Sequence, residues 1–393
     1  MPSTGSHGEG NPPETPLCVQ VVAVPGKMAY KWRMLTPMLM ETPWFSMLLV
    51  EFVVSTALVF FLATQLARYA DALEKTTAIG ALWIGGIFLA IVTSLPEAVA
   101  SIGSALDQNK ELLNLGVANL FGSNAFNLLI LILLDLRQKA PLLYSVSRDL
   151  LPAGIGGVVM VGVAGAAVAV HHYTGVGDAP RWLGLLFSLI LLVVYLVMTW
   201  ITKPKPLHQK GAGEQGTEPD EACPYSRQQI IGRLVFFAFA LVLVAWWLLQ
   251  ICDAMAETPF SILGRSITLG RTVTGTFLLS FATSSPEIFV CFAALRLGQT
   301  NMAVANLLGS NMVNMFFLPL MHLASRDWGF YARIDRLSIL TLMGVAILMT
   351  GLFMVGVLVR SKRDIFRLSW ATLSMLVVYV AGAWLVLKLG LQL

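Results

Sequence analysis

The sequence predicts an all-α membrane protein with ten transmembrane helices, arranged as two inverted repeats of five. Three observations indicate this fold class. First, 56% of the 393 residues are hydrophobic and only 12% are charged, whereas about a quarter of the residues in an ordinary soluble domain are charged. Second, ten segments are apolar enough to cross a bilayer. Third, one polar motif occurs once in each half of the chain.

The ten apolar segments define the predicted spans. A hydrocarbon core about 30 Å thick needs about 20 apolar residues in helical form. Such segments cover residues 44–67, 79–105, 113–136, 150–170, 181–201, 229–252, 270–295, 301–323, 337–359 and 368–391. Each half of the chain therefore contributes five spans.

Polar segments outside the spans set the domain boundaries. Residues 1–43 begin rich in Gly, Pro and Ser and lack the pattern of a signal peptide, so we expect a disordered or juxtamembrane tail. Residues 202–228 are almost free of apolar side chains, and we expect a solvated linker there. The linker separates the first repeat, 44–201, from the second, 229–393. Because five is odd, the second repeat enters the membrane from the opposite side, and the repeats are inverted.

The loop cations predict the orientation, because cytoplasmic loops carry an excess of Lys and Arg. One side has Arg137, Lys139, Arg148, Lys203, Lys205, Lys210, Arg227, Arg233, Arg360, Lys362, Arg363 and Arg367. The other side has Lys27, Lys31, Arg33, Arg326, Arg333 and Arg336. We therefore expect a multi-pass protein of the cell membrane, with the linker in the cytoplasm and both termini outside. The net charge of +4 is modest and spread over loops, so nucleic-acid binding is not expected.

The duplicated motif has two parts in each copy. In the first half, Thr93–Glu97 (TSLPE) is followed by Asn119–Asn127 (NLFGSNAFN). In the second half, Thr283–Glu287 (TSSPE) is followed by Asn306–Asn314 (NLLGSNMVN). All four parts lie inside apolar segments, where a carboxylate and amides are costly. Polar interruptions at matching positions of two halves are typical of transporters built from repeats.

The residue types in the motif favour a hard cation. Thr93, Ser94 and Glu97 lie on one helix face because they are three and four residues apart. Pro96 opens the helix, which frees carbonyl groups in the preceding turn; the second copy has the same arrangement. Hydroxyls, a carboxylate and free carbonyls at one level form an all-oxygen site suited to Ca²⁺ or Na⁺.

The two copies together predict one central site. We expect Glu97 and Glu287 to face each other near the midplane, with Asn127 and Asn314 completing it. Two carboxylates balance one divalent ion. Without a cation they would repel each other, so another cation must replace the departing ion, which favours exchange over a leak. A lone Pro-kinked helix with a glutamate could be purely structural, and a lone Ser–Asn pair could join helices, but duplication of the whole set favours function.

These motifs resemble the two α-repeats of the cation/calcium exchanger superfamily, and of sodium/calcium exchangers in particular. Those repeats have the form Gly-Thr-Ser-x-Pro-Glu, then Gly-Asn-x-x-Gly-Ser-Asn-x-Phe-Asn or a final Asp. The resemblance implies an antiporter that exchanges Ca²⁺ for Na⁺ by alternating access, with no cofactor and no obligate protein partner. The resemblance also assigns Ca²⁺ and Na⁺ binding to ten residues. Glu97 and Glu287 would be the principal ligands, with Asn127 and Asn314 at the centre and Thr93 and Thr283 binding through backbone carbonyls. The flanking Na⁺ positions would be formed by Ser94, Ser123, Ser284 and Ser310.

The sequence departs from this family pattern at several positions. Val92, Ala118, Ala282 and Ala305 replace glycines, and Val313 replaces a phenylalanine. These changes affect backbone freedom more than ligand chemistry. Asn rather than Asp at position 314 argues against coupling to K⁺, with which an Asp there is associated in one branch of the family.

Other functions remain open from the sequence. Exchange of Ca²⁺, or another divalent cation, for H⁺ is the main alternative, since both glutamates could take protons. A cation channel is a second alternative. An enzyme is not expected, because the sequence has no HExxH motif, no Ser/His constellation and no cofactor loop.

Several residues outside the motif are secondary candidates. Glu51 lies two turns into the first span, where it could gate or bind Na⁺ or, as we expect slightly more, reach headgroup water. Asp71 and Asp135 sit at span ends, where we expect them to be solvated. His171 and His172 are expected on a loop between spans, with metal binding disfavoured.

Overall fold

The structure is a computed structural model that describes residues 45–76, 89–107, 110–138, 141–174, 180–202, 226–262, 265–296, 298–360, 364–365 and 368–390. The predicted tail and nearly all of the predicted linker lie outside these residues. The described part is almost entirely helical, which follows from its composition: in lipid, a helix satisfies every backbone polar group within its own segment.

The helices of the first half are α2 (Phe45–Thr76), α4 (Leu89–Thr93), α5 (Leu95–Leu106), α6 (Lys110–Arg137), α7 (Leu142–Ser145), η3 (Arg148–Leu150), α8 (Leu151–Thr174) and α9 (Arg181–Ile201). Those of the second half are α10 (Arg227–Glu257), α11 (Arg271–Val273), η4 (Thr274–Leu279, π-helical), α12 (Ser280–Thr283), α13 (Ser285–Arg296), α14 (Thr300–Ser325), η5 (Phe330–Arg333), α15 (Arg336–Val359) and α16 (Trp370–Gly390). Two short antiparallel pairs, β1 (Phe260–Ile262) with β2 (Arg265–Ile267) and β3 (Asp364–Ile365) with β4 (Leu368–Ser369), join helices of the second half.

Among the described residues, eight helices are long and apolar enough to cross a membrane. A ninth span is possible if the bent pair Arg271–Thr283 and Ser285–Arg296 counts as one. The remaining predicted span, 79–105, is described only from residue 89, where α4 and α5 form its second part. The chain is therefore an integral multi-pass membrane protein.

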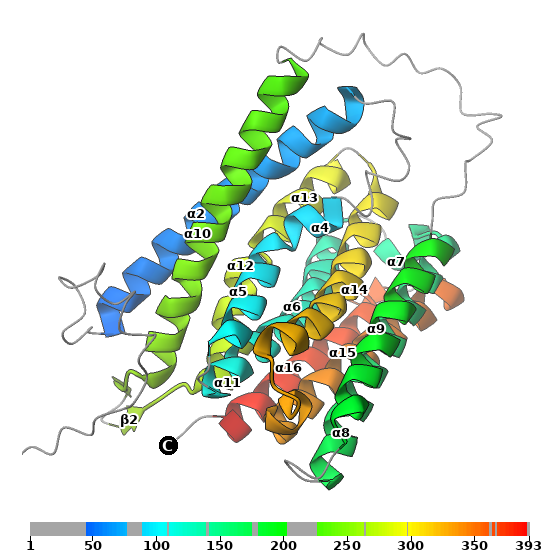
Figure 1. Ribbon diagram of the computed structural model, residues 1–393. Helices are drawn as coiled ribbons and strands as arrows, with labels where there is room; N and C mark the ends of the chain where they lie inside the picture. Colours follow the sequence, from blue (N-terminus) through cyan, green and yellow to red (C-terminus); the bar gives the residue numbers. More distant parts are fainter. Residues whose placement is uncertain are drawn as a thin grey trace, which may run out of the picture. The chain divides into compact units, whose positions relative to one another are not determined.

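Helices α2 and α10 pack together along their length in antiparallel directions (Figure 1). Phe45, at the start of α2, stacks on Phe260 just after α10, with ring centroids 4.3 Å apart. At the other end, Tyr69 stacks on Phe237 and accepts a 2.8 Å hydrogen bond from the Arg233 guanidinium. Aromatic contacts at both ends thus hold this pair together.

The remaining long helices form a bundle with α6 and α14 at its centre. These two helices are the most deeply buried of the candidate spans. Large side chains such as Phe121, Leu128 and Leu131 of α6 are fully buried in its core. The outer helices expose many apolar side chains, for example Leu189 of α9 and Val377 of α16, as expected for surfaces in lipid.

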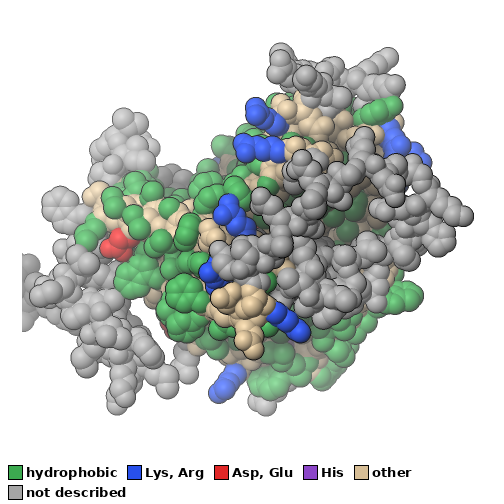
Figure 2. All heavy atoms as spheres, turned by 90° about the horizontal axis from the view of Figure 1, so that it is seen from above, with side chains coloured by type: hydrophobic (Ala, Val, Ile, Leu, Met, Phe, Trp, Pro, Cys, Tyr) green, Lys and Arg blue, Asp and Glu red, His purple; other side chains and the backbone are tan. Residues whose placement is uncertain are grey.

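The ends of the helices near residues 202 and 226 form a basic face. Figure 1 places the end of α9, the start of α10, the end of α13 and the start of α14 at the same end of the helices. Figure 2 views that end and shows more Lys and Arg than Asp and Glu side chains among the atoms drawn in colour. The described part of the chain therefore agrees with the charge bias expected from the loops.

Helix α6 approaches η4 closely at Gly122, in the first copy of the motif. A β-carbon at Gly122 would lie 2.6 Å from the Thr276 carbonyl oxygen and 2.8 Å from its α-carbon. Both atoms belong to the backbone, so they cannot move without shifting a helix. Gly122 is therefore required for the contact between a motif helix and the segment that leads to Glu287.

Replacing Gly122 with alanine is expected to destabilise the protein by about 1–3 kcal/mol, because overpacking forces the backbones apart. Thermal unfolding in detergent measures the change. Gly157→Ala in α8 is the matched control, since a β-carbon there meets nothing within 4 Å. Equal melting temperatures for the two variants would contradict the proposed steric role.

The prediction that Asp135 is solvated is wrong. Its side chain is fully buried near the end of α6. The carboxylate accepts hydrogen bonds from the Leu142 backbone N–H at 2.5 Å, the Ser369 N–H at 3.1 Å and the Thr372 hydroxyl at 2.5 Å. Asp135 therefore anchors α6 to the start of α16. The side chain of Asp71 lies outside the described residues.

The prediction of a loop at His171 and His172 is also wrong, because both lie within the last turn of α8. His171 is buried and its Nδ1 lies 2.8 Å from the Ala167 carbonyl oxygen. Nearby, His322 of α14 contacts the Ser188 hydroxyl of α9 through Nδ1 at 2.8 Å. His322 and Asp135 occupy matching positions, each eight residues after the last asparagine of its motif. Asp135 joins α6 to α16, and His322 joins α14 to α9. Each residue therefore connects a motif helix to the last long helix of the other half.

Candidate cation site

Each glutamate of the motif follows a break in its helix. Ser94 separates α4 from α5 with φ −87° and ψ 9°, and Ser284 separates α12 from α13 with φ −85° and ψ 6°. The prolines at positions 96 and 286 cause these breaks, since proline has no N–H for the preceding turn. The second pair is bent by 44°. Both breaks place a glutamate in the first turn of a helix, inside the bundle.

The two copies meet through reciprocal hydrogen bonds. The Ser284 hydroxyl donates to Glu97 Oε1 at 2.7 Å, and the Ser94 hydroxyl donates to Glu287 Oε1 at 3.4 Å. Ser310 also donates to Glu287 Oε1 at 3.4 Å. Ser94 and Ser284 thus each bind the glutamate of the opposite copy, which brings both carboxylates to one place between the two halves.

The amides of the motif are also paired across the two copies. Asn127 Nδ2 donates to Asn311 Oδ1 at 2.9 Å, and Asn314 Nδ2 donates to Asn124 Oδ1 at 3.0 Å. These bonds orient the amides by using their NH₂ groups. The carbonyl oxygens of Asn127 and Asn314 then remain available.

The central observation is a set of buried oxygens that have no hydrogen-bond partner among the described residues. Within the duplicated motif they are Glu97 Oε2, Glu287 Oε2, Asn127 Oδ1, Asn314 Oδ1, Asn306 Oδ1 and Ser123 Oγ. Buried polar atoms are almost always paired, so these six unpaired oxygens require an explanation. Carboxylate, amide and hydroxyl oxygens are the ligands preferred by hard cations.

Most predicted site residues converge in this structure. Glu97, Glu287, Ser94, Ser284 and Ser310 are linked by the bonds described above. Ser123 lies beside the Glu97 carboxylate, and Asn127 and Asn314 present buried oxygens.

The two threonine hydroxyls also donate hydrogen bonds to groups other than the glutamates. Thr93 Oγ1 donates to the Ala90 carbonyl at 3.2 Å, and Thr283 Oγ1 donates to Asn119 Oδ1 at 3.2 Å. Both threonines also lie beside a glutamate, Thr93 beside Glu287 and Thr283 beside Glu97.

Asn124 and Asn311 position other side chains of the site and were not among the residues predicted from the sequence. Both were visible in the motif, one residue after each Gly-Ser pair, and their duplication was the signal that could have identified them. They hold the amides of Asn314 and Asn127, respectively. Glu51 is half-buried in α2, and its Oε2 has no partner in the described part of the chain. Its role as a gate or a Na⁺ ligand stays a prediction.

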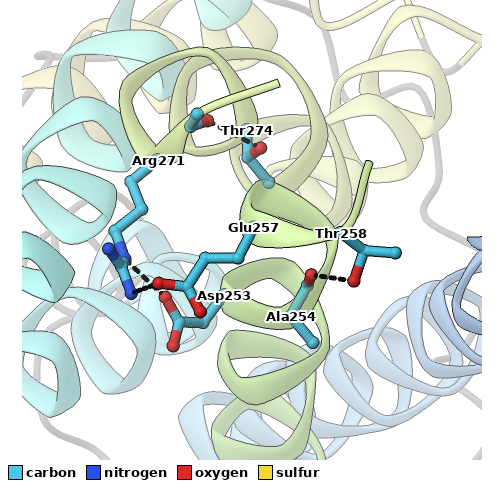
Figure 3. Close-up of polar contacts among 7 residues, drawn as sticks. Asp253, Ala254, Glu257, Thr258, Arg271 and Thr274 are labelled. Atoms are coloured by element: carbon cyan, nitrogen blue, oxygen red, sulfur yellow. Dashed lines mark hydrogen bonds and ion pairs between the residues drawn. The ribbon is translucent and has the colours of Figure 1, made fainter. Parts of the chain in front are cut away.

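Among the described residues, no ion pair joins Glu97 or Glu287 to a basic side chain, and Arg271 pairs with other carboxylates. Figure 3 shows Arg271, at the start of α11, directed at Asp253 and Glu257 of α10. Its Nε lies 2.6 Å from Asp253 Oδ1 and its Nη2 lies 2.6 Å from Glu257 Oε1. Buried carboxylates without a basic partner either bind a cation or take up a proton.

The fold and the candidate site define a class: an integral membrane protein with a buried cluster of carboxylate, amide and hydroxyl oxygens between two copies of one motif. A family model described as "Sodium/calcium exchanger protein" matches residues 47–203 and 230–388. The chain therefore belongs to the sodium/calcium exchanger family, as the resemblance of its motifs predicted.

The chain is also similar to proteins of known sequence or structure. The chain is 25% identical over 268 residues to the inner membrane protein YrbG of Escherichia coli (strain K12), covering 67% of this chain and 75% of YrbG. The fold resembles that of the Ca²⁺/H⁺ antiporter protein YfkE, with a TM-score of 0.59, 16% identity and coverage of 92% and 97%. It also resembles that of the sodium-calcium exchanger NCX_Mj, with a TM-score of 0.51, 19% identity and coverage of 86% and 98%.

Proposed function

We propose that this protein is a secondary antiporter that exchanges Ca²⁺ for Na⁺ by alternating access at the central site. The observation that carries the proposal is the set of buried, unpartnered oxygens of Glu97, Glu287, Asn127 and Asn314. Two carboxylates and two amide oxygens match one Ca²⁺ in both charge and ligand type. Because an empty site would leave two buried like charges, a replacement cation has to enter, which supports obligatory exchange.

We assign the ligand roles as follows. Glu97 and Glu287 bind Ca²⁺ and also Na⁺, and Asn127 and Asn314 close the centre. The hydroxyls of Ser94, Ser123, Ser284 and Ser310 bind Na⁺ at flanking positions, since three of them already contact a glutamate. Thr93 and Thr283 contribute backbone carbonyls, because each helix breaks at the next residue, Ser94 or Ser284, and the proline that follows opens the preceding turn.

We further propose ten transmembrane helices in two inverted repeats, 44–201 and 229–393, joined by the linker 202–228 and preceded by the tail 1–43. The reciprocal hydrogen bonds between the copies and the antiparallel pair α2–α10 support this architecture. The basic face at the ends of α9 and α10 (Figure 2) supports a cytoplasmic linker with the termini outside.

Exchange of Ca²⁺ for H⁺ is the second candidate. The fold is shared with a Ca²⁺/H⁺ antiporter protein as well as a sodium-calcium exchanger, and two carboxylates that release Ca²⁺ could each take a proton. The two candidates differ in what the serines do: they bind Na⁺ in the first and only orient the glutamates in the second.

Flux measurements in proteoliposomes separate the two candidates. We expect ⁴⁵Ca²⁺ uptake to be driven by an outward Na⁺ gradient at equal pH, with no effect of a K⁺ gradient. Uptake driven by a pH gradient in Na⁺-free buffer would favour the H⁺ mechanism instead. Uptake that needs no cation on the opposite side would contradict both candidates and indicate a channel. Ser284→Ala should weaken Na⁺-driven uptake, because it removes the hydroxyl nearest to Glu97.

A further inference from the structure

A second polar site lies on the basic face, away from the central glutamates. It is a cavity of about 330 Å³ where the end of α6 meets the end of α13 and the start of α14. Its walls include Arg137, Gln138, Phe292, Leu295, Arg296 and Thr300. The cavity thus has two arginines from different halves of the chain and an apolar wall on α13.

The two arginines have no carboxylate partner in the part of the chain that the structure describes. The ion pairs among the described residues involve Arg271 and Arg333 instead. Arg137 ends α6 and Arg296 ends α13, and both side chains are exposed. Two unpaired guanidinium groups that line one cavity repel cations, so the cavity is not a route for Ca²⁺ or Na⁺.

Other groups in the cavity add to its attraction for anions. Thr300 begins the 26-residue helix α14, and the N-terminus of a helix carries a partial positive charge. Gln138 Nε2 donates a 3.3 Å hydrogen bond to the Thr300 hydroxyl, which joins α6 to α14 across the cavity. Guanidinium groups match the oxygens of phosphate in geometry and charge.

We propose that this cavity binds the phosphate group of an anionic ligand, held between Arg137 and Arg296. The partly buried Phe292 and Leu295 offer a surface for acyl chains beside the phosphate, so the headgroup of an anionic phospholipid is the favoured source and free inorganic phosphate the other. A ligand held this way connects the first half to the helix that bears Glu287. The proposal is independent of which cation the central site exchanges.

The test measures binding to the purified full-length protein. Titration with phosphatidylglycerol, followed by native mass spectrometry and melting temperature, is compared with phosphatidylcholine and with inorganic phosphate. We expect phosphatidylglycerol to bind at least tenfold more tightly than phosphatidylcholine. The double variant Arg137→Gln/Arg296→Gln should lose this preference, while Arg227→Gln, which removes one exposed charge from the same face, should keep it.

Each outcome decides the proposal. Loss of phosphatidylglycerol binding in the double variant supports a lipid headgroup, and loss of inorganic phosphate binding alone supports a free phosphate. If neither ligand distinguishes the double variant from Arg227→Gln, the proposal is overturned. Arg137→Lys/Arg296→Lys keeps both charges in case the glutamine variant fails to fold; it should still bind more weakly, since lysine lacks the bidentate fork.

Discussion

Replacing Glu97 or Glu287 with glutamine is expected to reduce Ca²⁺ transport at least about 100-fold. Glutamine has nearly the same shape as glutamate, so packing around the site is preserved, but one of the two negative charges that balance Ca²⁺ is lost. Removing one partner of a buried charge interaction costs about 3–5 kcal/mol, which corresponds to a loss of about two to four orders of magnitude. Both variants should show the defect, because each copy of the motif supplies one carboxylate.

The measurement is ⁴⁵Ca²⁺ uptake into proteoliposomes, with size-exclusion chromatography and melting temperature as controls for folding. Glu257→Gln is the matched control: it makes the same chemical change at an exposed carboxylate, whose ion pair with Arg271 is worth at most about 1 kcal/mol. It should transport normally. Normal transport by a folded Glu97→Gln or Glu287→Gln variant would rule out the central site as the place where Ca²⁺ binds.

Replacing Asp135 with asparagine is expected to destabilise the protein by about 3 kcal/mol. Both carboxylate oxygens of Asp135 accept hydrogen bonds, from Leu142 N–H on one side and from Ser369 and Thr372 on the other. Asparagine would turn one acceptor into an NH₂ group that faces donors, and each buried donor left unpaired costs about 1–3 kcal/mol. The main consequence should be a looser junction between α6 and the start of α16.

Thermal unfolding in detergent measures this loss, and Asp149→Asn provides the matched control at an exposed aspartate in the nearby turn η3. Asp135 is eight residues from Asn127, or about 12 Å along the helix, so transport by the folded fraction should keep its dependence on Na⁺. A variant as stable as the wild type would show that the three hydrogen bonds contribute little.

The sequence could predict most residues of the candidate site, but not the residues that position them or anchor their helices. Glu97 and Glu287 were identifiable because each is a carboxylate inside an apolar segment, next to a helix-breaking proline, and the pattern occurs twice. The roles of Asn124 and Asn311 were missed, since the sequence shows that they are amides but not which amide they face. Asp135 and His171 were misplaced for a related reason: a polar residue near the end of a span could face water or the protein interior, and only the neighbouring helices decide which.

The sequence by itself determined that the chain is a helical membrane protein with a duplicated polar motif. Composition, apolar segments and motif spacing are properties of the chain alone and do not depend on how it packs. It also favoured a hard cation as the ligand, since the motif provides oxygen donors. Only the tertiary structure decided how the copies meet: Ser284 binds Glu97, Ser94 binds Glu287, and the amides pair between α6 and α14. The physical reason is that these contacts join residues more than 180 positions apart. Their geometry depends on how whole helices pack, which no local pattern specifies.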